Sequence, residues 1–137
     1  MRARYLADKS ALARMTLAPV RGRLAPLIDS GEIATCAMVD LEVLFSARNR
    51  EEHEKTRLRR RLAFVNVRLT EAIFERAIEV QGELSYTGKH RVPIPDLIIA
   101  AAAESAGLTV LHYDADFDQI AEVTGQAVEW VVPRGSV

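Results

Sequence analysis

Four carboxylates lie at the borders of the main apolar segments of the chain or inside them. They are Asp8, Glu42, Asp96 and Asp114. Carboxylates are seldom buried unless they pair with a cation or coordinate a metal ion. If the fold gathers these four, they repel one another, and a divalent cation is the usual remedy for that repulsion. The pattern therefore predicts one shared metal site.

Each acid also has an ordinary explanation when it is taken alone. Asp8, Asp96 and Asp114 stand where a helix N-cap is expected, and a cap contributes about 1 kcal/mol to its helix. Glu42 has an apolar flank, so its ordinary explanation is a partly exposed side chain or one paired with an arginine. One shared site accounts for the four acids more economically than four separate coincidences.

Further acids surround two of these positions. After Asp114 we expect Asp116 to be a secondary ligand and Asp118 to be a solvated charge. Asp40 lies about 200° from Glu42 around their common helix, because each residue of an α-helix turns by about 100°. We therefore expect Asp40 to lie outside the site.

Other polar and aromatic residues receive weaker assignments. Ser10 is expected to cap the first helix, although its hydroxyl could instead orient a carboxylate or a metal-bound water. The histidines share no spacing typical of metal ligands, and His112, inside a predicted strand, is expected to be structural. Tyr113 and Trp130 are expected to pack against neighbours rather than to stack on bases.

The composition is that of an ordinary globular domain. The chain has 137 residues, 49% hydrophobic content and a net charge of −1, which argues against nucleic-acid binding by bulk charge alone. The single cysteine, Cys36, excludes an intramolecular disulfide and a zinc–thiolate cluster. The N-terminus lacks a signal-peptide core, and the longest apolar stretch, 97–103, is too short to span a bilayer. A cytoplasmic protein without membrane contact is expected.

Short strands alternate with helices along the sequence. Strands are predicted at 4–7, 32–36, 64–67, 108–112 and 128–132, and helices at 10–15, 37–47, 71–84, 97–106 and 117–121. Between the first two strands, Pro19 and Gly22 are expected to interrupt or restart the helix. Thr70 is expected to cap the helix at 71–84, and the spacing of Leu41 places it on the apolar face of the helix at 37–47. This alternation predicts an α/β fold whose central parallel sheet of about four to five short strands is flanked by helices. Ligands of such sheets bind at the carboxyl edge, which three of the acids border.

Positive charge comes mostly from arginine and is concentrated in one segment. The only lysines are Lys9, Lys55 and Lys89, and residues 48–61 are the most charged part of the chain. This segment is expected to form the exposed end of a helical hairpin. Its cluster is by default a solvated helix face, and its functional interpretation is contact with RNA phosphates or an acidic partner. The residues concerned are Arg57, Arg59, Arg60 and Arg61.

The acids and their neighbours, in this order, resemble a PIN domain. The resemblance rests on four segments spread over nearly the whole chain: Asp8-Lys9-Ser10, Glu42, Pro95-Asp96 and Asp114-Ala115-Asp116-Phe117. Length and the expected single domain over 1–137 resemble the VapC toxins of bacterial toxin–antitoxin pairs. Lys9 departs from the family, which often has Thr or Ser there, but the flanking Asp and Ser are present.

The resemblance implies a metal-dependent endoribonuclease that cleaves structured RNA such as tRNA or rRNA. It implies Mg²⁺ or Mn²⁺ held by Asp8, Glu42, Asp96 and Asp114, with Asp116 assisting. It also implies a homodimer, which apolar faces on the early helices permit, and a VapB-like antitoxin that blocks the acidic site. Mg²⁺ suits such a site because it prefers oxygen ligands and can activate a water for attack on a phosphodiester.

Two other classes of function remain as alternatives. One is a Mg²⁺-dependent phosphotransfer domain, which also places acids at strand ends. Receiver domains need adjacent acids after the first strand and a late-strand lysine, but Asp8 stands alone and no lysine follows Lys89. Haloacid-dehalogenase-type phosphatases need an Asp-x-Asp pair at the first strand, where this chain has Asp8-Lys9-Ser10. A catalytically inactive PIN-like module that only binds RNA or protein is the second alternative. Metal-dependent cleavage of RNA discriminates it from the nuclease.

Overall fold

A five-stranded parallel sheet forms the centre of the protein, in the computed structural model that describes residues 2–137. Met1, the first residue of the expected domain, lies outside the described residues. The strands follow the order β3-β2-β1-β4-β5 across the sheet. They are β1 (Tyr5–Ala7), β2 (Ile33–Cys36), β3 (Val65–Val67), β4 (Thr109–His112) and β5 (Val128–Trp130). The predicted α/β class and parallel sheet are confirmed.

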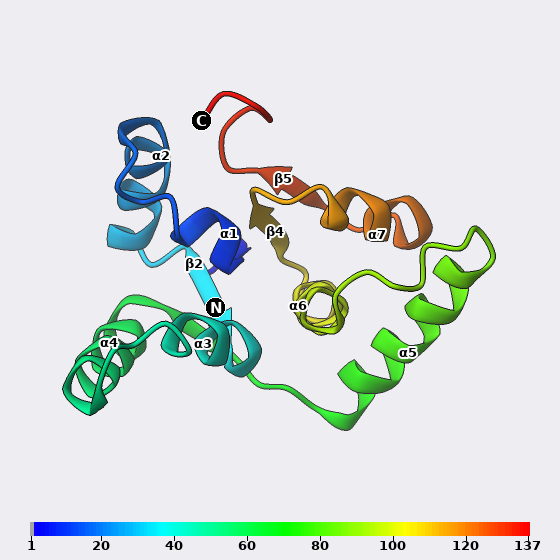
Figure 1. Cartoon of the computed structure of the whole chain (residues 1–137), viewed down its shortest axis with the longest axis horizontal. Helices are drawn as coiled ribbons and strands as arrows, with labels where there is room; N and C mark the ends of the chain where they lie inside the picture. The colour runs from blue at the N-terminus through cyan, green and yellow to red at the C-terminus, as the bar shows by residue number, and fades with distance from the viewer. Residues whose placement is uncertain (1) are drawn as a thin grey trace.

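Within residues 2–137, seven helices connect or flank these strands (Figure 1). They are α1 (Lys9–Leu12), α2 (Ala18–Asp29), α3 (Ala37–Leu44), α4 (Arg50–Ala63), α5 (Glu71–Ser85), α6 (Ile94–Ser105) and α7 (Asp116–Thr124). Local sequence sets several of their ends: Asn49 and Thr70 accept hydrogen bonds from the first turns of α4 and α5, and Gly125 ends α7 in the left-handed conformation, with φ of 70°. No helix within residues 2–137 combines the length and apolar content needed to cross a membrane.

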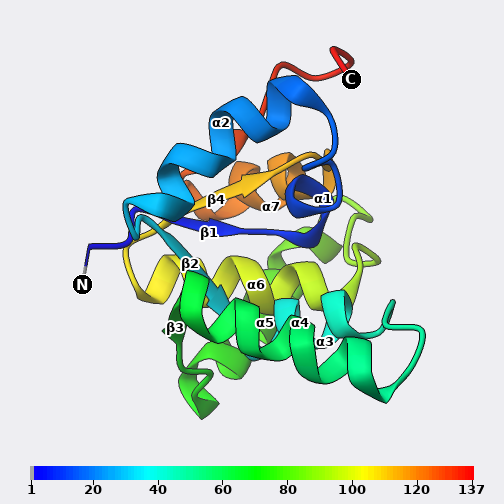
Figure 2. The same ribbon diagram turned by 90° about the vertical axis from the view of Figure 1, so that its left-hand side faces the viewer.

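The sheet separates two apolar cores. Leu6 and Val110 point to the side covered by α5, α6 and α7, whereas Tyr5 and Leu111 point to the side that carries α2. Figure 2 shows α2 on one side of the strands and α6 on the other. Because successive strand residues face opposite ways, burial on both sides makes β1 and β2 apolar throughout, apart from Thr35.

The strand order creates a reversal point beside β1. The chain runs outward from β1 to β2 and β3, then returns to the other side of β1 with β4 and β5. The register pairs Ala7 with Leu111, so the last residue of β1 lies beside the end of β4, and the amide of Asp8 donates to the carbonyl of Leu111 at 2.9 Å. Such reversal points leave a crevice at the carboxyl edge of the sheet, where α/β proteins bind ligands.

Local expectations are met only in part. The helix does restart at Pro19, because α1 ends at Leu12 and Pro19 lies in the first turn of α2, where proline is tolerated, but Gly22 lies inside α2 without interrupting it. Asp96 does not cap its helix: α6 begins at Ile94, so Asp96 lies within the first turn. On α3, Leu41 is 65% exposed although its spacing had predicted an inward face, because the buried side of this short helix carries Val39.

Arg60 also differs from its expected role as an RNA contact. The residue is buried, and its Nε donates to Asp40 Oδ1 at 2.9 Å while its second terminal nitrogen donates to Thr35 Oγ1 at 2.9 Å. Its guanidinium carbon lies 4.8 Å from the centre of the Phe64 ring. These contacts fasten α4 to α3 and β2. The ion pair between Arg60 and Asp40 also holds Asp40 away from Glu42, as expected from the helical rotation.

Replacing Arg60 should therefore affect stability. We expect Arg60→Ala to lower the free energy of unfolding by about 1–3 kcal/mol, because Asp40 and Thr35 lose their partner in a poorly solvated place. Arg59→Ala is the matched control, since Arg59 is exposed on the same helix and surface changes usually stay within about 0.5 kcal/mol. Urea unfolding measures both variants, and equal midpoints would contradict the structural role of Arg60.

Candidate active site

Asp8 connects the end of β1 to the crevice. Its Oδ2 accepts a hydrogen bond from the amide of Ser10 at 2.9 Å, so the residue does cap α1 as its ordinary explanation proposed. The cap occupies only half of the carboxylate. Oδ1 is buried and has no hydrogen-bond partner among the described residues. Helix capping therefore does not account for the buried oxygen.

Asp96, in the first turn of α6, is the most perturbed acid of the group. It is 6% exposed, and its Oδ2 has no partner in the described part of the chain. Burial, followed by repulsion from Asp8, Asp114, Asp116 and Glu42, raises its pKa from 3.8 to about 8. The other four predicted acids therefore all lie near enough to Asp96 for their charges to act on it.

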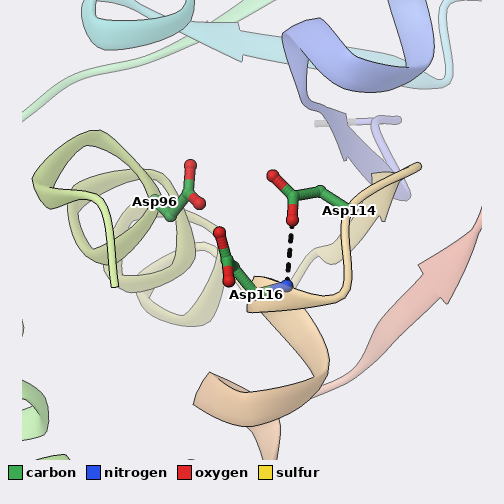
Figure 3. Close-up of side chains that lie close together, drawn as sticks. All are labelled: Asp96, Asp114 and Asp116. Atoms are coloured by element: carbon green, nitrogen blue, oxygen red, sulfur yellow. Dashed lines mark hydrogen bonds between the residues drawn. The ribbon is translucent and has the colours of Figure 1, made fainter. Parts of the chain in front are cut away.

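Asp96, Asp114 and Asp116 form the tightest part of this group. One carboxylate oxygen from each lies within 4.8 Å of the others. Figure 3 shows the three side chains converging from α6, from the loop after β4 and from the start of α7. Asp114 Oδ1 also accepts from the amide of Asp116 at 3.0 Å, which fixes the turn between them. Burial, followed by the charge of Asp114, raises the pKa of Asp116.

Glu42 approaches the group from α3. Its Oε1 is buried without a partner, and burial, followed by the charge of Asp8, raises its pKa. The charge of Lys9 lowers the pKa of Glu42, but Glu42 forms no ion pair with any basic side chain within residues 2–137. The alternative in which an arginine neutralises Glu42 therefore fails for the described part of the protein.

Buried carboxylate oxygens without hydrogen-bond partners indicate whether the acid group suits a metal ion. Of the buried side-chain polar atoms without a partner in residues 2–137, three are carboxylate oxygens, and they belong to Asp8, Glu42 and Asp96. A buried acceptor without a donor costs free energy, and a nearby like charge adds to that cost. A hard divalent cation satisfies oxygen acceptors and removes the repulsion together. The donor set therefore fits Mg²⁺ or Mn²⁺.

Two residues behind the acids hold the main chain in place. Ser10 Oγ accepts from the amide of Tyr113 at 2.9 Å, so the hydroxyl ties α1 to the end of β4 rather than capping α1. His112 Nδ1 accepts from the amide of Asp114 at 3.0 Å. His112 is fully buried, and burial lowers its pKa, which favours the neutral ring with its proton on Nε2. The sequence signalled His112 only as a polar residue in an apolar strand.

Asp118, the third acid after β4, lies outside the group formed by Asp96, Asp114 and Asp116. Asp118 is not simply solvated, because its Oδ2 accepts from the Trp130 indole nitrogen at 3.0 Å and its Oδ1 lies 3.7 Å from His112 Nε2. The tight group contains Asp114 and Asp116 but not Asp118. Trp130 and Tyr113 pack edge to face with ring centres 5.1 Å apart, as expected of packing groups.

Comparison with known families agrees with this geometry. The family model for the PIN domain matches residues 5–123, which include all five acids. The chain is also 50% identical over 137 residues to Ribonuclease VapC21 of Mycobacterium tuberculosis, with 99% of each chain covered.

This chain belongs to the VapC family of PIN-domain proteins.

Solved structures show the same fold at low sequence identity. VapBC2 from Rickettsia felis, bound to a DNA fragment from its promoter, contains a chain that superposes with a TM-score of 0.74 at 14% identity, covering 91% of this chain and 96% of that one. VapBC-5 from Mycobacterium tuberculosis, a member of the VapBC family of toxin–antitoxin systems, gives 0.58 at 24%, covering 95% and 98%. The fold expected from the resemblance is therefore confirmed.

The raised pKa of Asp96 makes the stability of this VapC chain depend on pH. In the unfolded chain Asp96 ionises near 3.8, and in the folded chain near 8. Between these values the folded state binds more protons, so the free energy of unfolding of the metal-free protein falls as pH rises through this window. The shifts at Glu42 and Asp116 have the same sign.

We therefore expect the Tm in EDTA to fall between about pH 5 and pH 8, and to fall less steeply in Asp96→Asn, which cannot ionise. Differential scanning fluorimetry of both proteins across this range measures the difference in slope. Mg²⁺ should raise the Tm most at the alkaline end, where the acids are charged. Parallel curves for the two proteins in EDTA would contradict the assigned pKa of Asp96.

Proposed function

We propose that this VapC-family chain is the ribonuclease toxin of a VapBC-type toxin–antitoxin pair and that its endonucleolytic activity requires a divalent cation. The observation that carries this proposal is the meeting of five carboxylates at one sheet edge, three of them with buried oxygens that no group of the described protein satisfies. The name of its half-identical relative, Ribonuclease VapC21, supports the reaction class. A pure binding module would have no need of such a costly arrangement.

Asp96, Asp114 and Asp116 would hold Mg²⁺ or Mn²⁺, with Asp8 and Glu42 completing the acid shell. When bound, the cation activates a water and offsets negative charge on the phosphodiester undergoing hydrolysis. The chain itself positions the acids. Ser10 and His112 hold the loop after β4 through its amides, and Asp8 fixes α1 with one oxygen while the other faces the crevice.

Asp96 also controls the loading of the site. With a pKa of about 8, its carboxyl group holds a proton at neutral pH until a cation competes for the same oxygens. A cation held by these oxygens would displace that proton from Asp96. The acids keep RNA phosphates away while the cation is missing, because both carry negative charge.

The substrate we propose is structured cellular RNA, tRNA or rRNA, which places the protein in the cytoplasm. Arg57, Arg59 and Arg61 are exposed on α4 and form no ion pair among residues 2–137, so they are available to phosphates. Arg60 is not part of this proposal because its guanidinium is already bonded. Each phosphate contact that is lost should reduce the salt dependence of RNA binding.

The partners we propose are a VapB-like antitoxin and a second copy of the chain. Support for the antitoxin comes from VapBC-5, which is described as a member of a toxin–antitoxin family and shares the fold. Support for a homodimer comes from large apolar side chains left exposed on α5 and just after α3, including Ile78 at 62% and Phe45 at 88%.

Substitution of two central acids tests the nuclease. We expect Asp8→Asn and Asp96→Asn to reduce Mg²⁺-dependent cleavage of total tRNA by more than about 100-fold, since even groups behind a metal ligand often contribute 10–100-fold. Both variants should fold, because asparagine matches aspartate in shape and, at position 8, also caps a helix well. Gel electrophoresis of tRNA with Mg²⁺ or EDTA provides the readout.

Glu51→Gln is the matched control, because Glu51 is an exposed acid on α4, well separated in sequence from the site. It should cleave like the unaltered protein. Full activity in Asp8→Asn or Asp96→Asn would refute the site. RNA binding by the unaltered protein without Mg²⁺-dependent fragments would instead favour the inactive binding module.

A further inference from the structure

A hollow beside the acid group has features that neither the metal nor the fold requires. It lies between the loop that joins α5 to α6 and the start of α7, and its volume is about 340 Å³. The side chains that matter are Lys89, Arg91, Val92, Pro93, Asp116 and Gln119. The volume falls within the range of about 300–1,000 Å³ that is common for small-ligand pockets.

Asp116 belongs both to the acid group and to the lining of the hollow. One of its carboxylate oxygens lies within 4.8 Å of those of Asp96 and Asp114, and the same residue lines the hollow. A strand whose phosphodiester lies at the acid group therefore reaches the hollow with the next part of its backbone. We infer that the hollow binds the nucleotide adjacent to the scissile phosphate, which deepens the nuclease proposal above and rests on it.

The charge of the hollow suits a phosphate. Arg91 lines the hollow, is exposed and forms no ion pair among the described residues. Lys89 has only a long contact of 3.5 Å to Glu122, and its side chain is 43% exposed. The Arg91 guanidinium and the Lys89 ammonium give the hollow positive charge beside the acid group, so the RNA backbone can continue there without repulsion.

The remaining lining suits a nucleoside better than a bare phosphate. Pro93 is exposed and offers an apolar surface against which a ribose or base can pack, while Val92 behind it is buried in the core. The side-chain amide of Gln119 makes no hydrogen bond within residues 2–137, and it carries both donors and an acceptor. Glutamine in such a position can read a base edge. The hollow therefore combines a backbone contact through Arg91 with a base contact through Gln119.

The first test is RNA binding at several salt concentrations. The probe is a fluorescein-labelled, single-stranded 12-nucleotide RNA of mixed sequence, with Mg²⁺, and all variants carry Asp8→Asn to prevent cleavage. We expect Arg91→Gln to weaken binding several-fold and to reduce the slope of log K against log salt by about 0.7, the value for one lost single-strand phosphate contact. Arg91→Lys should keep most of the slope, because it keeps the charge.

Arg2→Gln is the matched control, because Arg2 precedes β1 and therefore lies toward the opposite edge of the sheet, and the substitution removes the same charge. An Arg91→Gln slope equal to that of Arg2→Gln, in a variant with unchanged circular dichroism, overturns the inference. The second test sequences the RNA ends produced by active Gln119→Leu. We expect a changed base preference next to the cut, and an unchanged preference overturns the base contact.

The two levels of proposal fail separately. If the unaltered protein produces no Mg²⁺-dependent fragments from tRNA, the proposed nuclease itself fails. If it cleaves, while Arg91→Gln and Gln119→Leu behave like the unaltered protein in slope, rate and base preference, the nuclease stands and the hollow is not a nucleotide subsite.

Discussion

Repulsion among five carboxylates at one edge of the sheet is the constraint on which the rest of this structure depends. Asp96 carries the clearest sign of it, because burial and four acidic neighbours together raise its pKa to about 8. A protein selected only for stability would remove such a cluster, since buried acceptors without donors and adjacent like charges both cost free energy. Hydrogen bonds to the main chain nevertheless hold Asp8, Asp114 and Asp116 in place.

That positioning comes from main-chain contacts rather than from flexible side chains. The parallel pairing of β1 with β4 brings the residues after each strand together, and the amide of Asp8 is bonded to the carbonyl of Leu111. His112 and Ser10 then hold the two amides that flank the start of the acidic loop. The acids are thus presented by rigid elements, which is how a site keeps its geometry before a cation arrives.

The arginines divide the remaining tasks according to burial. Arg60 is a structural residue that joins α4 to α3 and β2, whereas its neighbours Arg59 and Arg61 remain on the surface. Arg91 stands next to the acid group, on a loop that also forms part of a hollow. Residues of one type therefore differ in role because the fold leaves some guanidinium groups bonded and others open to solvent.

The fold class, and the five acids that the structure places near Asp96, were both predictable from the sequence. Both follow from local patterns: short apolar runs between helical segments specify the strands, and acids at the ends of those runs must meet if the strands are parallel. Thr70 as a helix cap was equally visible, because capping depends on a few adjacent residues. The PIN resemblance was visible for the same reason, since its motifs follow these strand and helix ends.

The roles of residues whose partners come from another part of the chain became visible only in the folded structure. The arginine run did not reveal that Arg60 turns inward, because its partners Asp40 and Thr35 come from α3 and β2. The spacing of Leu41 predicted an inward face that the packing of α3 leaves open, and His112 gained its role from an amide two residues later. Periodicity states which residues share a face, but the elements that pack there decide whether that face is buried, bonded or exposed.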